Sequence, residues 1–354
     1  MIRNPIKRDV LIAVVLFALM LAVPLLTGTR YVLTQLTVFF IWAVVASQWN
    51  LVLGVAGIFS LAQMALFAVG AYATAMLAYY IGLMLPAAML LAALVTVGVS
   101  LVIGFACLRL KGPYVALLTL AIGQVMYLLV VNDTACFTMP ASGCLPLFGG
   151  ARGFSRFGDL GFRDLLGSKW YIGHYYTGLV LLLAAQLFCI AIIHGPLGLA
   201  FRGLRDNPGL ALARGVSRMR YQLWVFGLSA FFTGLAGAFH AAQFGVVGPT
   251  AFAFAMLLFI LAMIVVGGLG TTWGPLIGAA LLMWADEGLR EVSDWREIGI
   301  GFVLAACVIL FPKGLAGIRL RSGRGPDPRQ DAPPAPPPHT RPSATPGAGP
   351  AATG

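Results

Sequence analysis

Long apolar runs separated by short polar segments dominate this chain. A helix needs roughly 17 to 25 apolar residues to cross a bilayer, and by that measure we expect about ten membrane-spanning helices. The candidate spans lie at about residues 10–26, 32–53, 64–83, 86–108, 113–131, 174–194, 221–241, 252–267, 276–290 and 297–312. Several are short or interrupted by glycine or proline. The pattern predicts an all-α polytopic membrane protein.

One polar segment, residues 195–220, stands out between two apolar runs because it is rich in arginine. Within it, Asn207 is suited to an N-cap, Pro208 to the first helical position and Gly215 to the position just past a helix end. This order predicts a short helix over about residues 208–214. Two helical turns are marginally stable alone, so we expect the helix to pack against another surface. The arginines of this segment, called the arginine loop below, are Arg202, Arg205, Arg214, Arg218 and Arg220.

The composition agrees with a membrane protein and argues against a soluble fold. Hydrophobic residues make up 60% of the chain and charged residues only 10%, with a mean hydropathy of +0.91. So few polar groups could not cover the surface of a soluble protein of this length. The bilayer is therefore the expected main solvent of the chain.

The net charge of +11 is explained by topology. Lysine and arginine near span ends are retained in the cytoplasm. If the N-terminus is cytoplasmic, most of the basic residues fall inside, including the whole arginine loop. The C-terminus is then cytoplasmic as well. The basic excess is not evidence for nucleic-acid binding, because no basic-aromatic patch or recognition fold accompanies it.

The two ends differ from the central part of the chain. Residues 1–31 hold a basic N-terminal segment and the first span, which lacks a convincing signal-peptidase site and is expected to be retained. Residues 32–318 form the transmembrane domain. Residues 319–354 are rich in proline, alanine and glycine, a composition that cannot build a core, and we expect a disordered cytoplasmic tail.

The cysteines divide by their position along the chain. Cys107, Cys189 and Cys307 lie in predicted spans, where they are expected to pack as small apolar residues. Cys136 and Cys144 lie in the outward segment 132–173, where an oxidising periplasm permits a disulfide. A bridge and two free thiols both stay open, because sequence does not give the Cα separation.

The spans offer little material for catalysis or ion coupling. No acidic or basic residue falls within a predicted hydrocarbon core, which argues against a proton- or sodium-driven carrier, although backbone carbonyls could still bind sodium. No metalloprotease or serine-hydrolase motif occurs, and the absence of any Gly-Lys pair excludes a Walker A loop. Polar residues inside the spans favour interhelical hydrogen bonding over substrate contact: Gln35, Gln48, Asn50, Gln63, Gln124, Gln186, Gln222, His240 and Gln243.

Glycines gather in two breaks between spans, at residues 54–57 and 267–278. Broken segments in two halves of a transporter commonly expose backbone groups at a binding site. Gly270, Gly274 and Gly278 recur every four residues, as in closely packed helices, but Pro275 equally favours a tight turn that opens the next span. Spans 2–5 and 7–10 begin on opposite sides, so an inverted repeat is geometrically allowed.

Four motifs occur in order between about residues 40 and 318. Together they resemble the permease subunit of branched-chain amino acid ABC importers of the LivM type. The motifs are Asn50-Leu51 with Gly54-x-x-Gly57 and Phe59-Ser60-Leu61-Ala62-Gln63; Arg109-x-Lys111-Gly112-x-Tyr114; Arg202-x-x-Arg205-Asp206-Asn207 with Ala211 and Gly215; and Gly267-Gly268-Leu269-Gly270-Thr271-x-Trp273-Gly274-Pro275.

The resemblance implies a set of partners in the bacterial inner membrane. A cytoplasmic ABC ATPase hydrolyses ATP, a second homologous permease completes the pore, and a periplasmic solute-binding protein delivers substrate. The chain itself would bind no cofactor and no metal. The resemblance implies ATPase coupling by Arg202, Arg205, Asp206, Asn207, Ala211 and Gly215. We expect the translocation pathway near Gly54, Gly57, Ser60, Gln63, Gly267, Gly268, Gly270 and Thr271.

The chain departs from the family pattern at two places. Leu212 occupies a position where a glutamate is common, which removes one candidate salt bridge to the ATPase. Residues 139–144 replace a stretch that is often glycine-rich, so contacts with the binding protein are expected to differ.

The sequence therefore favours a non-enzymatic permease subunit for ATP-driven import of branched-chain or related aliphatic amino acids. Import of urea or short amides uses the same architecture and stays open. A stand-alone carrier or channel is the alternative from another class, and it would not depend on an ATPase partner.

Overall fold

The protein is a bundle of membrane-length helices in a computed structural model that describes residues 5–26, 29–107, 110, 112–139 and 144–289, with 299, 301, 305, 309, 314 and 315. The long helices are α1 (Pro5–Leu26), α2 (Arg30–Asn50), α3 (Gln63–Ile81), α4 (Leu85–Cys107), α5 (Pro113–Val131), α7 (Trp170–His194) and α10 (Arg218–Phe244). The shorter ones are α6 (Phe162–Leu166), α8 (Pro196–Asp206), α9 (Pro208–Ala213), α11 (Phe254–Gly267) and α12 (Gly274–Gly288).

Short elements connect these helices. A π-helical turn, η1 (Leu51–Val55), continues α2, and single 3-10 turns occur at η2 (Gly150–Arg152), η3 (Gly167–Lys169) and η4 (Pro249–Phe252). Two small antiparallel sheets pair β1 (Cys136–Thr138) with β2 (Leu145–Pro146), and β3 (Phe154–Ser155) with β4 (Val246–Val247). The second sheet joins segments that are far apart in the sequence.

Seven of the described helices are long and apolar enough to cross a membrane. They correspond to the first seven predicted spans. The next two predicted spans correspond to α11, with 14 residues, and α12, with 15 residues; at a rise of about 1.5 Å per residue, each falls short of a bilayer of about 30 Å. The tenth, at 297–312, lies almost entirely outside the described residues. The polytopic helical architecture is confirmed.

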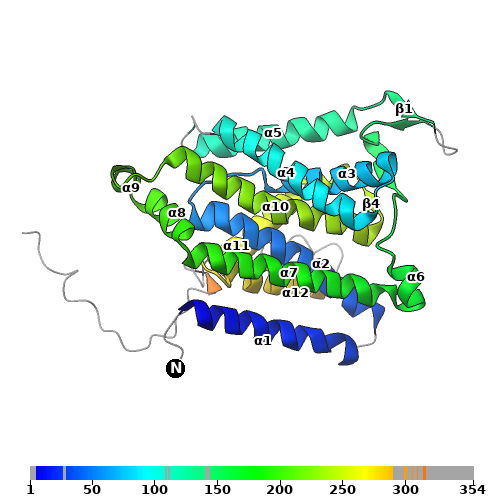
Figure 1. Ribbon diagram of the computed structural model, residues 1–354, viewed down its shortest axis with the longest axis horizontal. Coiled ribbons are helices and arrows are strands. Elements are labelled where there is room, and N and C mark those ends of the chain that lie inside the picture. The colour runs from blue at the N-terminus through cyan, green and yellow to red at the C-terminus, as the bar shows by residue number, and fades with distance from the viewer. Residues whose placement is uncertain are drawn as a thin grey trace, which may run out of the picture. The chain divides into compact units, whose positions relative to one another are not determined.

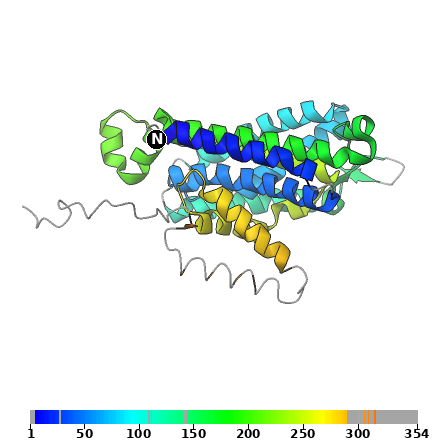
Figure 2. The ribbon, with the colours of Figure 1, turned by 90° about the horizontal axis from the view of Figure 1, so that it is seen from below.

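Helix α10 lies at the centre of the bundle and packs against α2, α3 and α4. Small residues let its backbone approach α3 closely: a Cβ at Gly237 would overlap the carbonyl of Phe67, and a Cβ at Gly70 would overlap the carbonyl of Gly234. This is the packing by which membrane helices associate without a hydrophobic driving force between them. By contrast, α1 lies along α7 at an edge of the bundle (Figures 1 and 2).

The two ends of the bundle are built differently. Figure 1 shows α8, α9 and the start of α1 at one end, which we call the α8–α9 end. It shows β1, β4 and α6 at the opposite end, which we call the strand end.

Candidate functional site

The short helix expected in the arginine loop is present as α9. Asn207 caps it: its Oδ1 accepts a hydrogen bond from the backbone N–H of Leu210 at 3.0 Å. Pro208 occupies the first helical turn, and Gly215 follows the helix with a left-handed φ of +82°. Each residue therefore plays the local role that its chemistry favours, and the predicted helix is confirmed.

Arg205 connects the arginine loop to the first glycine cluster. Its Nη1 donates to the carbonyl of Gly54 in η1, and its Nε donates to Asp206 Oδ1 at 2.8 Å. The side chain lies so close to Gly57 that a Cβ there would overlap its methylenes. The hydrogen bond from Arg205 holds the pKa of Asp206 below its usual value. Arg205 is thus a physical link between loop and span.

Asn50 connects the second glycine cluster to the first. The Asn50 Nδ2 donates to the carbonyl of Thr271 at 2.9 Å, and the Gly270 N–H donates to Asn50 Oδ1 at 2.8 Å. A Cβ at Gly54 would overlap both Asn50 Oδ1 and Gly270 N, so only glycine fits there. We call these five residues, Asn50, Gly54, Arg205, Gly270 and Thr271, the junction.

The turn between α11 and α12 resolves the question about the glycine repeat. Gly270 has a φ of +72° and lies in a turn, not on a helix. Thr271 Oγ1 donates to the Gly268 carbonyl at 2.7 Å and accepts from Gly274 N at 3.1 Å, which starts α12. Of the three repeated glycines, Gly278 lies inside the helix, where a Cβ would overlap the Met263 carbonyl of α11. The glycines therefore form a tight turn before α12, and Gly278 also allows a close contact between α12 and α11.

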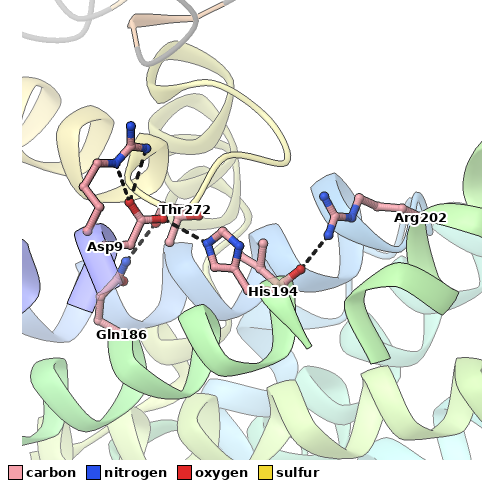
Figure 3. A network of polar contacts seen from close by, with 7 residues as sticks. Asp9, Gln186, His194, Arg202 and Thr272 are labelled. Atoms are coloured by element: carbon pink, nitrogen blue, oxygen red, sulfur yellow. Dashed lines mark hydrogen bonds and ion pairs between the residues drawn. The ribbon is translucent and has the colours of Figure 1, made fainter. Parts of the chain in front are cut away.

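Arg202 contacts a different helix from Arg205. Its Nη2 donates to the carbonyl of Ile193 at 2.6 Å (Figure 3). Its Nε donates to the carbonyl of Gly198 at 3.2 Å. The last carbonyls of a helix lack intrahelical partners and form the negative end of its dipole. Arg202 therefore stabilises the C-terminus of α7.

A polar network beside Arg202 was not predicted from the sequence. The buried Asp9 of α1 accepts from His194 Nε2 at 2.9 Å, or receives its proton, and Arg8 lies 3.5 Å from the same carboxylate (Figure 3). Gln186 of α7 donates to the carbonyl of Thr272 at 2.8 Å. Only Gln186 had a sequence signal, as a polar residue inside a span. Asp9 and His194 come from separate span ends that no pattern relates.

Most of the remaining predicted site residues are in buried contacts. The Ser60 carbonyl accepts from Trp49 Nε1 at 2.8 Å, and Gln63 donates to Thr233 Oγ1 at 2.5 Å. Gln48 donates to Cys189 Sγ at 3.3 Å. Together with the contacts of Asn50 and Gln186, these bonds support interhelical hydrogen bonding as the role of span amides. Ala211 is 8% exposed and packs α9 against the molecule.

A cavity of about 290 Å³ lies where the arginine loop meets the bundle. Gly57 and Phe59 line it from the first glycine cluster, Arg205 and Pro208 from the arginine loop, and Gln222 from α10. The cavity therefore lies next to the junction, between the arginine loop and the spans.

The strand end carries the two outward cysteines. Cys136 and Cys144 are joined by a disulfide across the β1–β2 hairpin, with Cα atoms 5.4 Å apart, a separation that suits a bridge. Among the residues that the structure describes, no group of three histidine, cysteine or acidic side chains is placed to hold a metal ion.

Comparison with known proteins gives a consistent result. The family described as the branched-chain amino acid transport system permease component matches residues 31–311. The chain is 32% identical to the high-affinity branched-chain amino acid transport system permease protein LivM of Salmonella typhimurium strain LT2 over 306 residues, covering 81% of this chain and 72% of the relative. It is 31% identical to LivM of Escherichia coli K12 over 321 residues, covering 87% and 75%. No solved structure matches the chain significantly.

Proposed function

The chain belongs to the family of permease components of branched-chain amino acid transport systems, and from that premise we propose that it is the transmembrane subunit of an ATP-driven importer of branched-chain amino acids. The membrane-length helices supply the framework for a pathway through the bilayer. The absence of a Gly-Lys pair leaves the chain without a Walker A loop, so ATP hydrolysis falls to separate cytoplasmic subunits.

The observation that carries the coupling mechanism is the junction. Arg205 links the arginine loop to η1, and Asn50 links the end of α2 to the α11–α12 turn. In the proposed mechanism, closure of a cytoplasmic ATPase dimer pushes α9, and Arg205 passes the displacement to Gly54. Asn50 passes it on to Gly270 and Thr271. One push thereby reaches two broken segments that come from separate halves of the chain.

Charge supports the proposed orientation in a bacterial inner membrane. The α8–α9 end carries Lys7, Arg8 and the arginine loop, and basic residues near span ends stay in the cytoplasm. At the strand end, basic side chains are interspersed with acidic ones, including Asp133, Asp159 and Asp164. We therefore place the N-terminus and α9 in the cytoplasm, facing the ATPase, and the strand end in the periplasm, facing the solute-binding protein.

A second homologous permease completes the proposed transporter. The edge helix α1 and much of α5 present apolar side chains outward, such as Leu19, Leu25, Leu117 and Leu129. Lipid and a partner permease are the occupants of such surfaces in this architecture. The C-terminal segment from residue 319 remains a proposed cytoplasmic tail outside the described residues.

Uptake of radiolabelled leucine tests the proposed function directly. Cells that lack this gene, with and without its return, are compared in the presence of unlabelled valine, isoleucine or urea. We expect uptake to be lost and rescued, and to be blocked by valine and isoleucine but not by urea. Inhibition by urea alone would move the substrate to small amides. Uptake that persists without the cytoplasmic ATPase genes would point to a stand-alone carrier.

A further inference from the structure

A second polar cavity lies at the strand end, the opposite end of the bundle from the arginine loop. Its volume is about 330 Å³, within the range of small-molecule sites. The segment from β3 into α6 contributes Arg156, Asp159 and, within α6, Arg163; the start of α7 contributes His174, and the end of α10 contributes Gln243. Three separate parts of the chain thus converge on one cavity with charged and polar walls.

Two buried side chains in this cavity have unused hydrogen-bonding groups. His174 is 1% exposed, and among the described residues neither of its ring nitrogens has a partner with normal hydrogen-bond geometry, although the Gln243 side chain lies close enough to interact with the ring. Its Nε2 lies 3.9 Å from Asp159 Oδ1. Gln243 is 9% exposed, and its Oε1 likewise has no hydrogen-bond partner within the described part of the chain. Buried polar groups are nearly always bonded in native proteins, so unbonded ones need an explanation.

Opposite charges lie side by side at the mouth of the same cavity. Arg163 Nε is 3.7 Å from Asp159 Oδ2, and the side chains are 67% and 32% exposed. The Arg163 guanidinium lies over the ring of Trp170, 5.2 Å from its centroid, which holds the cation in place. Each charged group keeps capacity for a further partner, because a carboxylate accepts several hydrogen bonds and a guanidinium donates five.

The backbone that forms this wall is held in an unusual conformation. Arg156 is a non-glycine residue with a left-handed φ of +56°. Its N–H donates to the Gly245 carbonyl at 3.2 Å, next to the β3–β4 pairing of Phe154 with Val247. Residues other than glycine rarely adopt this backbone conformation unless the surroundings impose it, and residues that do so cluster at ligand-binding sites. The strand pairing therefore fixes the cavity wall onto the end of α10.

We propose that this cavity binds the charged ends of an α-amino acid zwitterion as it enters from the periplasm. Arg163 and a ring N–H of His174 take the carboxylate, and Asp159 and Gln243 Oε1 take the ammonium group. The aliphatic side chain lies against the apolar part of the lining, Phe244 and Val246. Two oppositely charged groups and two further polar groups match a ligand that carries both charged groups on one carbon atom. The inference rests on the proposed function, because it names the entry site for the same substrates.

Equilibrium binding to the full transporter complex tests this inference without the solute-binding protein. The complex in lipid nanodiscs is titrated with radiolabelled leucine, and the label is displaced by leucine, by leucinamide, which lacks the carboxylate, or by 4-methylpentanoate, which lacks the ammonium group. The variants are Asp159→Asn and Arg163→Gln, both at positions accessible to solvent, so the fold should be retained. Arg152→Gln is the matched control, because Arg152 is an exposed arginine at the same end that does not line the cavity.

We expect leucine to displace the label at least tenfold more strongly than either analogue. Asp159→Asn should weaken leucine binding about tenfold and should reduce the preference for leucine over 4-methylpentanoate, because the ammonium partner is lost. Arg163→Gln should also weaken leucine binding about tenfold, and should reduce the preference for leucine over leucinamide. Arg152→Gln should leave binding unchanged. A purely structural role would weaken all three ligands equally.

Three results would overturn the inference. One is no saturable leucine binding to a complex that still supports leucine uptake in cells. Another is unaltered binding in Asp159→Asn and Arg163→Gln. The third is unaltered leucine binding with a weaker response of ATPase activity to the loaded binding protein, which would make this face a protein docking surface. If cells show no leucine uptake through this chain at all, the proposed function fails first.

Discussion

Arginines at the two ends of the bundle are held by different partners. At the α8–α9 end, Arg202 and Arg205 donate to main-chain carbonyls of Ile193 and Gly54. At the strand end, Arg163 lies beside a carboxylate and an aromatic ring, over a cavity in which, among the described residues, the buried Gln243 Oε1 and the His174 ring nitrogens lack partners with normal hydrogen-bond geometry. A cation bonded to a helix end ties two elements together, whereas a cation at a cavity mouth is available to a ligand.

The difference follows from what the neighbouring backbone offers. Helices α7 and α2 end beside the arginine loop, and helix C-termini expose carbonyl oxygens that attract cations. At the strand end, the backbone carbonyls of β3 and β4 are partly used by the sheet between them. Residues of the same type therefore connect elements at one end and line a cavity at the other.

Reversing the charge of Arg205 should have the largest effect on function. Arg205→Glu removes the bond to Gly54 and sets an anion beside its carbonyl. A hydrogen bond to a charged group contributes about 1.5–3 kcal/mol, so we expect transport-coupled ATPase activity to fall about tenfold or more. The measurement is ATPase activity of the complex in proteoliposomes with loaded binding protein.

Arg214→Glu is the matched control for that variant. Arg214 is an exposed residue of the same loop, and the charge change is identical. Retained coupling in Arg214→Glu would assign the effect to the contact with Gly54. Equal loss in both variants would show that the charge of the loop, not the junction, controls the ATPase.

Adding a methyl group inside the junction should have the next largest effect. In Gly54→Ala the new Cβ overlaps Asn50 and the backbone of Gly270. Overpacking of this kind costs about 1–3 kcal/mol, so the thermal unfolding temperature should drop by several degrees in detergent. Gly98→Ala in α4 is the control, because nothing lies within 4 Å of a Cβ there. An unchanged Gly54→Ala variant would mean that η1 and the α11–α12 turn separate easily.

Neutralising one arginine at each end compares how much each contributes to the free energy of unfolding. Arg202→Gln loses charge-assisted bonds at the end of α7 and should destabilise the protein by about 1–2 kcal/mol. Arg163→Gln loses only a solvent-exposed ion pair and a ring contact, and should change stability by less than about 1 kcal/mol. Thermal unfolding of both variants, with and without high salt, checks this. A larger loss in Arg163→Gln would show that the strand end is the rigid one.

The sequence predicts the helices well because span length and capping are local properties. Asn207, Pro208 and Gly215 determine α9 through their own backbone preferences, with no knowledge of the rest of the fold. The spans at α11 and α12 are less well predicted, since the turn between Gly267 and Gly274 leaves each helix short of a bilayer. Apolar composition alone does not show where a half-length helix ends.

The sites depend on contacts that sequence separation hides. Both glycine clusters and the arginine loop stood out in the sequence. The sequence did not predict that Asn50, Arg205 and Gly270 meet. The resemblance implied a coupling role for Arg202 and Arg205, which stays a prediction, and the structure adds that their side chains bond to this chain's own carbonyls. Of the strand-end cavity only Gln243 had a signal, as a polar span residue, because Asp159, His174 and Gln243 come from three segments and share no motif.

Leu212→Glu should have the smallest effect and is informative for that reason. Leu212 is 52% exposed in the last turn of α9, so an added acid should change the free energy of unfolding by no more than about 0.5 kcal/mol. An anion on this surface should instead alter ATPase binding modestly and in a salt-dependent way. Dissociation of the ATPase from the purified complex, followed at two salt concentrations, measures that change. If Leu212→Glu abolished coupling as completely as Arg205→Glu, the apolar face of α9 would control the push and the arginine contact would only position it.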